Sequence, residues 1–213
     1  MHSSCAIINQ MIGTKILEEV ESKYNGHVRV VKTFGLGTYI QADGLTQSGG
    51  IVEGFWDQTL KKVHSSLPLV GSSLILGLGG GTAAKLIRKI WPGSKINGID
   101  LDPLMVELGK KYLDLNETEV EVKIQDAYIF KGRYDLILID LYNGDKFPEK
   151  FGEVEFLRRI RSGLTKNGYA IFNRTFYGDN RTKALKFGKK LEKVFAKVEY
   201  YYPEVNLMVI CHN

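Results

Sequence analysis

The sequence contains few of the residues that build covalent cross-links or metal sites. Of its 213 residues only two are cysteines, Cys5 and Cys211, and they lie near opposite ends of the chain. Isolated cysteines of this kind are usually inert thiols, although a disulfide between them stays open. The four histidines are scattered, and the sequence has no His-x-x-x-His or Cys-x-x-Cys spacing. We therefore expect no metal site.

Long apolar runs are also missing. No segment approaches the ~20 consecutive apolar residues that a membrane-spanning helix needs. Residues 1–14 lack a basic beginning, and Asn9, Gln10 and Gly13 interrupt their apolar stretch, unlike a signal peptide. These absences predict a cytoplasmic protein that does not contact a membrane. The length suits one α/β domain with a small extension, and 44% apolar and 25% charged residues are ordinary values for a globular protein.

A strong charge of one sign is the third absence, since the formal net charge is only +5. Basic residues gather at positions 158–161 and 181–193, where apolar residues at helical spacing occupy the opposite face. This pattern favours solvated helix faces over a nucleic-acid-binding surface, and no aromatic platform accompanies the charge. Nucleic acid is therefore a disfavoured partner.

Glycine, in contrast, is concentrated at one informative place. Residues 74–82 read Leu-Ile-Leu-Gly-Leu-Gly-Gly-Gly-Thr, which is typical of an apolar strand followed by a turn. Gly77, Gly79 and Gly81 allow a sharp turn and a close approach of the backbone to a ligand. Asp100 follows about 20 residues later, after a second apolar run, where a carboxylate can accept hydrogen bonds from both hydroxyls of a ribose. This order of elements predicts a nucleoside-containing cofactor.

The apolar spacing divides the chain into residues 1–65 and residues 66–213. The first part predicts a helix over 6–23, a hairpin over 27–42 with a short strand near Leu45, and a helix over 53–64. In the second part strands alternate with helices, and a hairpin over 197–211 closes the chain. Its predicted strands are 73–76, 95–99, 120–124, 134–139 and 168–172, and its predicted helices are 82–90, 103–113, 154–162 and 181–195. This order predicts an α/β fold with the Rossmann-like sheet of class I methyltransferases, mostly parallel with a C-terminal antiparallel hairpin, and a small N-terminal helix and β-hairpin extension.

Several segments carry a resemblance to a known family. They are Asp-Gly-Leu-Thr-Gln at 43–47, Glu-Gly-Phe-Trp-Asp-Gln at 53–58, the glycine loop, Asp-Ala at 126–127, and Asp-Leu-Tyr-Asn-Gly-Asp-Lys-Phe-Pro at 140–148. With these residues the chain, from about Val30 to its C-terminus, resembles the spermidine-synthase-like branch of the class I AdoMet-dependent methyltransferase superfamily. The last segment looks more like the spermidine-synthase-like proteins than like the polyamine enzymes proper.

The resemblance implies a site. Asp140 would be the catalytic carboxylate, which orients the acceptor or accepts its proton. The residues expected to hold the cofactor are Gln47, Gly77, Gly79, Gly81, Asp100, Leu101, Asp126 and Ala127. The residues expected near the acceptor are Glu53, Trp56, Tyr142, Asn143 and Asp145. Plainer roles stay open for four of these residues, because Asp140 can cap a helix, Trp56 and Tyr142 can belong to the core, and Asp145 can form part of an ordinary turn.

The chain departs from the family at three acids that bind the aminopropyl group or the diamine. The glycine loop has Gly80 where aminopropyltransferases have an aspartate that pairs with the cofactor's ammonium. Val52 and Asn143 replace two further acids that grip the diamine. Because burying two ammonium groups without carboxylate partners is costly, these losses argue against putrescine as the acceptor.

We therefore favour a methyltransferase that uses S-adenosylmethionine (AdoMet) and acts on a small-molecule acceptor, whose identity the sequence does not reveal. Aminopropyl transfer from decarboxylated AdoMet is the second hypothesis, with Asp145 or Glu53 replacing the lost acids. A non-catalytic nucleoside-binding protein is the third, and nucleic-acid methylation, supported by mild basicity alone, is the fourth. The N-terminal region, with Ile8 and Ile12, is a candidate surface for a homodimer.

Overall fold

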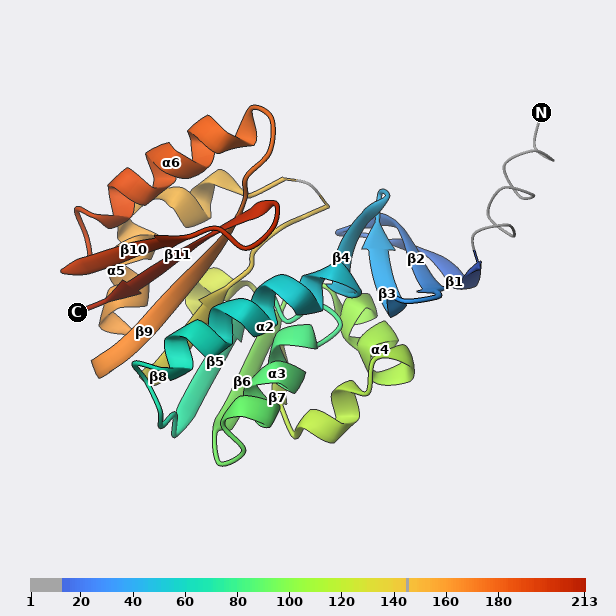
Figure 1. Cartoon of the computed structure of the whole chain (residues 1–213), viewed down its shortest axis with the longest axis horizontal. Coiled ribbons are helices and arrows are strands. Elements are labelled where there is room, and N and C mark those ends of the chain that lie inside the picture. The colour runs from blue at the N-terminus through green and yellow to red at the C-terminus, as the bar shows by residue number, and fades with distance from the viewer. Residues whose placement is uncertain (1–12, 145) are drawn as a thin grey trace.

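The computed structural model describes residues 13–144 and 146–213, which form two sheets and the helices that cover them (Figure 1). The first sheet is antiparallel, in the order β1-β2-β3-β4, and the second has seven strands, in the order β10-β11-β9-β8-β5-β6-β7. The strands are β1 (Thr14–Ser22), β2 (Gly26–Thr33), β3 (Gly37–Ala42), β4 (Leu45–Gly49), β5 (Ser72–Leu76), β6 (Lys95–Asp100), β7 (Glu121–Ile124), β8 (Tyr134–Ile139), β9 (Leu164–Thr175), β10 (Lys197–Tyr201) and β11 (Asn206–His212). The helices are α2 (Ile51–His64), α3 (Thr82–Ile90), α4 (Pro103–Tyr112), α5 (Val154–Ser162) and α6 (Asn180–Leu191), with 3-10 turns η1 (Leu115–Thr118), η2 (Ala127–Ile129) and η3 (Glu149–Gly152).

The seven-stranded sheet confirms the predicted fold class. Strands β5 to β9 pair in parallel, whereas β11 runs antiparallel to β9 and β10 antiparallel to β11. The apolar runs 74–76 and 136–139 are buried on both faces of the sheet. Such continuous burial explains why these strands read as unbroken apolar segments, and it is the expected pattern for the centre of a parallel sheet.

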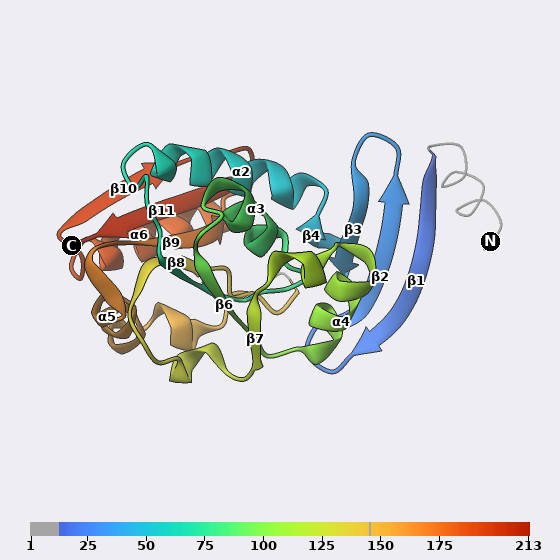
Figure 2. The same cartoon turned by 90° about the horizontal axis from the view of Figure 1, so that it is seen from below.

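Helices cover both faces of this sheet (Figure 2). On one face, α2 and α3 pack with buried residues such as Trp56 and Ile87. On the other face, α5 and α6 pack with Phe156 and Phe187. Because the two helical layers leave only the strand ends open, a ligand site is expected at the carboxyl edge of the parallel strands.

The N-terminal sheet corrects one prediction. Residues 14–22 form β1, an edge strand paired with β2, and not the end of a helix over 6–23. Ile16 and Val20 are four residues apart, an even spacing that a strand of period two shares with a helix, so the pattern alone was ambiguous. The pairing of β1 with β2 makes this segment a strand. Residues 6–12, with Ile8 and Ile12, lie outside the described residues, so a homodimer through this region stays a prediction.

The remaining N-terminal elements agree with the predicted hairpin and short strand. Strands β2 and β3 pair antiparallel around the turn after Thr33, and β4 follows. One face of this sheet packs on α4, where Met105 and Leu108 meet Val30 and Ile40. The N-terminal sheet is thus held against the half of the main sheet that carries the glycine loop, although the boundary at residue 65 itself stays a prediction.

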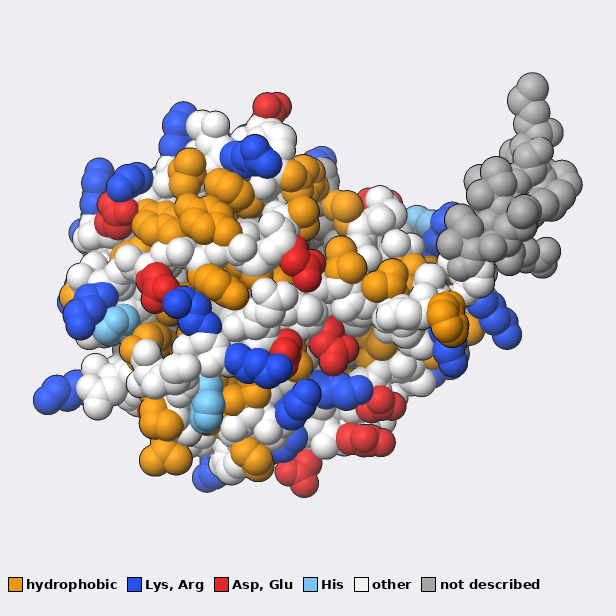
Figure 3. All heavy atoms as spheres, viewed as in Figure 1, with side chains coloured by type: hydrophobic (Ala, Val, Ile, Leu, Met, Phe, Trp, Pro, Cys, Tyr) orange, Lys and Arg blue, Asp and Glu red, His pale blue; other side chains and the backbone are white. Residues whose placement is uncertain are grey.

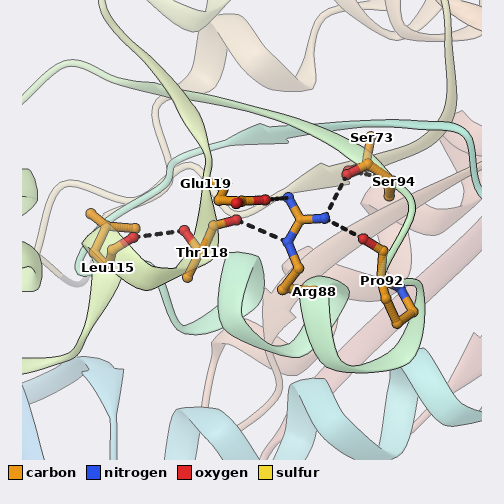
Figure 4. A network of polar contacts seen from close by, with 7 residues as sticks. All are labelled: Ser73, Arg88, Pro92, Ser94, Leu115, Thr118 and Glu119. Atoms are coloured by element: carbon orange, nitrogen blue, oxygen red, sulfur yellow. Dashed lines mark hydrogen bonds and ion pairs between the residues drawn. The ribbon is translucent and has the colours of Figure 1, made fainter.

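Arg88 connects η1 with the turn that follows α3 (Figure 4). Its Nε donates to the carbonyl oxygen of Thr118 at 3.1 Å, and its Nη1 donates to the carbonyl oxygens of Pro92 and of Ser94. This arrangement holds η1 in place, and a Cβ at Gly81 would lie only 2.3 Å from Cδ1 of Leu115 in η1. The turn therefore supports the loop from behind.

Three findings bear on the predicted absences. None of the helices in the described ranges combines the length and hydrophobicity that crossing a bilayer requires. Over the same ranges, no group of three or more histidine, cysteine, aspartate or glutamate side chains is placed to hold a metal ion. Cys211 is a buried free thiol in β11, whereas Cys5 lies outside the described residues.

Candidate active site

A cavity runs along the carboxyl ends of the parallel strands, from β7 at one end to β9 and β11 at the other. We call its two parts the β6–β7 half and the β9–β11 half. The β6–β7 half is lined by Gly77, Gly79, Asp100, Leu101, Asp126, Ala127, Pro148, Lys150 and Phe151. The β9–β11 half is lined by Ile51, Val52, Phe55, Asp140, Tyr142, Asn143, Asn173, Thr175, Tyr177, Val205 and Asn206.

The glycine loop connects the two halves. Gly77, Gly79 and Gly81 have φ angles of 87°, 54° and 92°, which side chains rarely tolerate. A Cβ at Gly77 would lie 2.1 Å from the carbonyl oxygen of Asp140, so this glycine lets the end of β8 approach the loop. Gly77 and Gly79 line the cavity, whereas Gly81 packs against Leu115 behind it.

Asp100 is anchored to the glycine loop. Its Oδ2 accepts a hydrogen bond from the N–H of Gly79 at 2.6 Å, and its Oδ1 accepts one from the N–H of Asp102 at 2.9 Å. Burial raises the pKa of Asp100, and these backbone donors partly oppose the rise. Each oxygen keeps a second lone pair, so the carboxylate can also accept hydrogen bonds from ligand hydroxyls in the cavity.

Asp126 lies at the far end of the β6–β7 half, beside Ala127. Its Oδ1 accepts a hydrogen bond from the N–H of Tyr128 at 2.9 Å, and its Oδ2 pairs with the ammonium of Lys150. Burial opposes ionisation of this carboxyl, but the Lys150 ammonium and the Tyr128 N–H outweigh it, so the pKa of Asp126 is lowered. Lys150 was not predicted from the sequence, because nothing near it in the chain signals its partner.

Asp140 is buried at the junction of the two halves. Its Oδ1 accepts a hydrogen bond from Nδ2 of Asn173 at 2.8 Å, and its Oδ2 accepts one from Nε1 of Trp56 at 3.0 Å. Asn206 in turn donates its Nδ2 to Oδ1 of Asn173 at 2.7 Å. We call these four residues the Asp140 network. Burial raises the pKa of Asp140 to about 6, against the two donors, which lower it.

The Asp140 network fixes where this carboxyl can take up a proton. The indole N–H of Trp56 can only donate, and the amide of Asn173 is oriented as a donor because its oxygen is already used by Asn206. Neither partner can accept a proton from Asp140. A proton can therefore bind only at the remaining lone pairs of the carboxylate, and Asp140 lines the cavity.

The loop after β8 is held in place by the N-terminal sheet. Gln47 donates its Nε2 to the carbonyl oxygen of Gly144 at 3.2 Å, and the N–H of Gly144 donates to Oδ1 of Asn25 at 3.4 Å. Tyr142 accepts a hydrogen bond from the N–H of Thr175 at 2.9 Å. Both Gln47 and Asn25 line the cavity, but only Gln47 was predicted. The tertiary packing of the β1–β2 turn brings Asn25 to the site.

Among the described residues, Glu53, Trp56 and Gly80 do not line the cavity. Glu53 is exposed on the first turn of α2, and Trp56 acts from behind Asp140. A Cβ at Gly80 would lie 2.8 Å from Ile40, toward the N-terminal sheet, so Gly80 faces away from the cavity in this structure. Asp145 lies outside the described residues.

The chain is similar in sequence to curated proteins named as aminopropyltransferases and as methyltransferases. No protein-family model matches the chain. Polyamine aminopropyltransferase 2 from Aquifex aeolicus is 31% identical over 191 residues, which are 83% of this chain and 38% of that protein. The eEF1A lysine and N-terminal methyltransferase homolog from Drosophila melanogaster is 27% identical over 66% of this chain and 23% of that protein. The chain spans between 25% and 38% of the length of three such curated relatives.

Solved structures show the same two groups. A probable spermidine synthase from Corynebacterium glutamicum has a TM-score of 0.76 at 19% identity, covering 93% of this chain and 80% of that one. The chain is similar to the spermidine-synthase-like branch of the class I methyltransferase superfamily. Human methyltransferase-like protein 13, solved with SAH, has a TM-score of 0.58 at 24% identity, covering 76% of this chain and 79% of that one. At these identities the structures show the fold alone.

Proposed function

We propose that the chain is an AdoMet-dependent transferase that transfers a methyl group to a small-molecule acceptor. The proposal rests on the place where the β6–β7 half and the β9–β11 half of the cavity meet. The glycine loop and Asp140 meet there, because Gly77 lies against the backbone carbonyl of Asp140, and the buried carboxylate of Asp140 lines the same cavity. A cofactor bound along the β6–β7 half would thus end next to Asp140.

The residues of the β6–β7 half fit a nucleoside. Asp100 presents free lone pairs beside a glycine loop whose residues Gly77 and Gly79 have no side chains. Asp126 and Ala127 form the far end, where a carboxylate suits an adenine amino group. Leu101, 38% exposed in the described structure, offers an apolar surface to a flat ring. When bound, AdoMet would supply an electrophilic methyl group on its sulfonium.

Asp140 would prepare the acceptor for this reaction. An acceptor in the β9–β11 half must present a lone pair to the methyl carbon and lose a proton before or after transfer. The Asp140 carboxylate can take that proton at a cavity-facing lone pair, since its other positions are committed to Trp56 and Asn173. The same contacts hold the carboxylate in one orientation, which aligns the acceptor.

Methyl transfer is favoured over aminopropyl transfer by the side chains at the acceptor's end of the cavity. Val52 and Asn143 line this half, and neither carries a negative charge that could form an ion pair with an ammonium group of a diamine. Aminopropyl transfer from decarboxylated AdoMet remains the second candidate, since the Aquifex aeolicus relative carries the name of that activity.

Calorimetric titration with AdoMet, decarboxylated AdoMet and methylthioadenosine tests the proposal. We expect AdoMet to bind more tightly than the decarboxylated form. Preference for decarboxylated AdoMet would favour the aminopropyl reaction instead. If none of the three ligands binds to correctly folded protein, the proposal fails, and a non-catalytic protein that kept the fold without the cofactor takes its place.

A further inference from the structure

The β9–β11 half has an unusual balance of charge. Among its described residues, Asp140 is the one carboxylate that lines the cavity, and no lysine or arginine lines this half. The other polar groups are the amides of Asn143, Asn173 and Asn206 and the hydroxyls of Thr175, Tyr142 and Tyr177. An anionic acceptor would meet a carboxylate without a compensating cation. A single positive charge would meet one partner, and a second would meet none among the described residues of this half.

One wall of this half is apolar. Val52 and Phe55 are buried at its inner side. Ile51, Tyr177 and Val205 stand at its mouth with 46%, 42% and 51% of their surface exposed. Hydrophobic side chains are exposed on the face of the molecule that carries α6, β10 and α2 (Figure 3). An apolar wall that ends at one charged group matches a ligand with an apolar body and one polar end.

We propose that the acceptor is a monoamine, a primary or secondary amine carried on an uncharged apolar body. This inference rests on the proposed function and names its substrate class. The amine lies against Asp140, and the apolar body lies between α2 and the turn before β11, along Val52, Phe55 and Val205.

The step balances within these groups. The ammonium form of the amine gives one proton to the Asp140 carboxylate. Its freed nitrogen lone pair then forms a bond to the methyl carbon of AdoMet, while the carbon–sulfur bond breaks and its electron pair stays on sulfur, leaving a thioether. Burial in the same apolar site favours the neutral amine and the neutral carboxyl, which brings their proton affinities closer together. The proton leaves Asp140 when the methylated product departs.

A matched series of six-carbon ligands tests the substrate class. The protein is saturated with S-adenosylhomocysteine and titrated with hexylamine, 1,6-hexanediamine, hexan-1-ol and hexanoate, which differ only in their ends. We expect hexylamine to bind about tenfold more tightly than the diamine or the alcohol, and hexanoate to bind most weakly. Equal or tighter binding of the diamine, the alcohol or the acid overturns the inference, and so does binding of none.

Turnover with AdoMet separates this inference from the proposed function. We expect mass spectrometry to show methylated hexylamine. Methylation of the alcohol or the acid instead leaves the function standing and overturns the amine assignment. Binding of hexylamine without transfer to any ligand in the series overturns the function, and the site then stands as a binding site for monoamines.

A charge placed on the wall tests where the apolar body lies. In Val205→Asp, a carboxylate at the exposed mouth should shift the preference toward the diamine about threefold, the usual size of an exposed ion pair. Val154→Asp is the matched control, because Val154 is 41% exposed at the start of α5 and outside the cavity lining. Val52→Asp should shift the preference more, provided that AdoMet binding shows it to be folded. A folded Val205→Asp protein whose preference equals that of the control contradicts the placement.

Discussion

The two halves of the cavity differ in how their carboxylates are held. In the β6–β7 half, Asp100 is fixed by backbone N–H groups of neighbouring turns, and Asp126 is fixed by a backbone N–H and an exposed lysine. In the β9–β11 half, Asp140 is fixed by side chains from two other elements, Trp56 of α2 and Asn173 of β9.

This difference suggests that the two halves have different tasks, cofactor binding in the β6–β7 half and acceptor chemistry in the β9–β11 half. Backbone donors are present in any sequence that makes the turn, so the β6–β7 half suits a ligand shared by a whole superfamily. Side-chain donors can change with single substitutions, so the β9–β11 half suits an acceptor particular to this chain. We therefore expect changes in one half to leave the other half largely intact.

The largest effect should follow the loss of the Asp140 carboxylate. Asp140→Asn removes the proton acceptor, and we expect turnover to fall by about 10² to 10⁴-fold with AdoMet affinity changed less than about threefold. Rate assays and calorimetry check both values. Asp114→Asn is a matched control, since Asp114 pairs with Lys85 on the surface. Unchanged turnover in Asp140→Asn would refute the role of Asp140.

The next largest effect should be confined to the β6–β7 half. Asp100→Asn leaves one oxygen to face two backbone donors, from Gly79 and Asp102, so one donor loses its partner. We expect AdoMet to bind about 10- to 100-fold more weakly, the usual cost of one or two charge-assisted hydrogen bonds. Binding of hexylamine, measured without cofactor, should change little. A comparable loss of amine binding would show that the halves are coupled.

The pH dependence of activity should follow the ionisation of Asp140 in the β9–β11 half. Because the pKa of Asp140 is about 6, activity should fall about tenfold per pH unit below 6, as the carboxylate is protonated. The folded-state pKa is raised above the usual value of 3.8, so the contribution of Asp140 to stability is full below pH 4 and is lost as pH rises through 6.

Trp56 offers a direct reading of this titration, because its indole N–H donates to Asp140. In a Trp91→Phe protein, Trp56 is the remaining tryptophan, and its N–H resonance should shift with a midpoint near pH 6. The shift should vanish in the double variant with Asp140→Asn. A midpoint near pH 4 would show that Asp140 ionises like an exposed carboxyl.

The same contrast explains what the sequence could predict. The glycine loop and Asp100 belong to one strand–turn–helix–strand segment, so their relation is visible as spacing along the chain. The Asp140 network joins Trp56, Asn173 and Asn206, which come together only when β8, β9 and β11 pair and α2 packs on the sheet. A polar Asn173 at the end of a buried strand was the one local signal for this network.

Two other features depended on contacts distant in sequence. Strand β1 was predicted as a helix because its four-residue spacing fits both structures, and pairing with β2 decides between them. Gly80 was interpreted as a missing countercharge, but its neighbours Ile40 and Leu113 belong to other elements and direct that position away from the cavity. Spacing along a chain does not show which side of a loop faces a ligand.

The smallest effect should come from Lys150, which tests how far the β6–β7 half depends on side chains. Lys150 is partly exposed, and its ammonium occupies the Oδ2 of Asp126 that an adenine amino group would use. Losing the ion pair in Lys150→Met weakens the hold on the carboxylate but frees that oxygen for the ligand, and the two effects oppose each other. We expect AdoMet affinity to change less than about fivefold, as is usual for an exposed pair.

Lys123→Met, which breaks a similar pair with Glu121 on β7, is the control. A loss of more than tenfold in Lys150→Met alone would mean that this lysine contacts the cofactor itself, and that the β6–β7 half, too, is built in part from distant side chains.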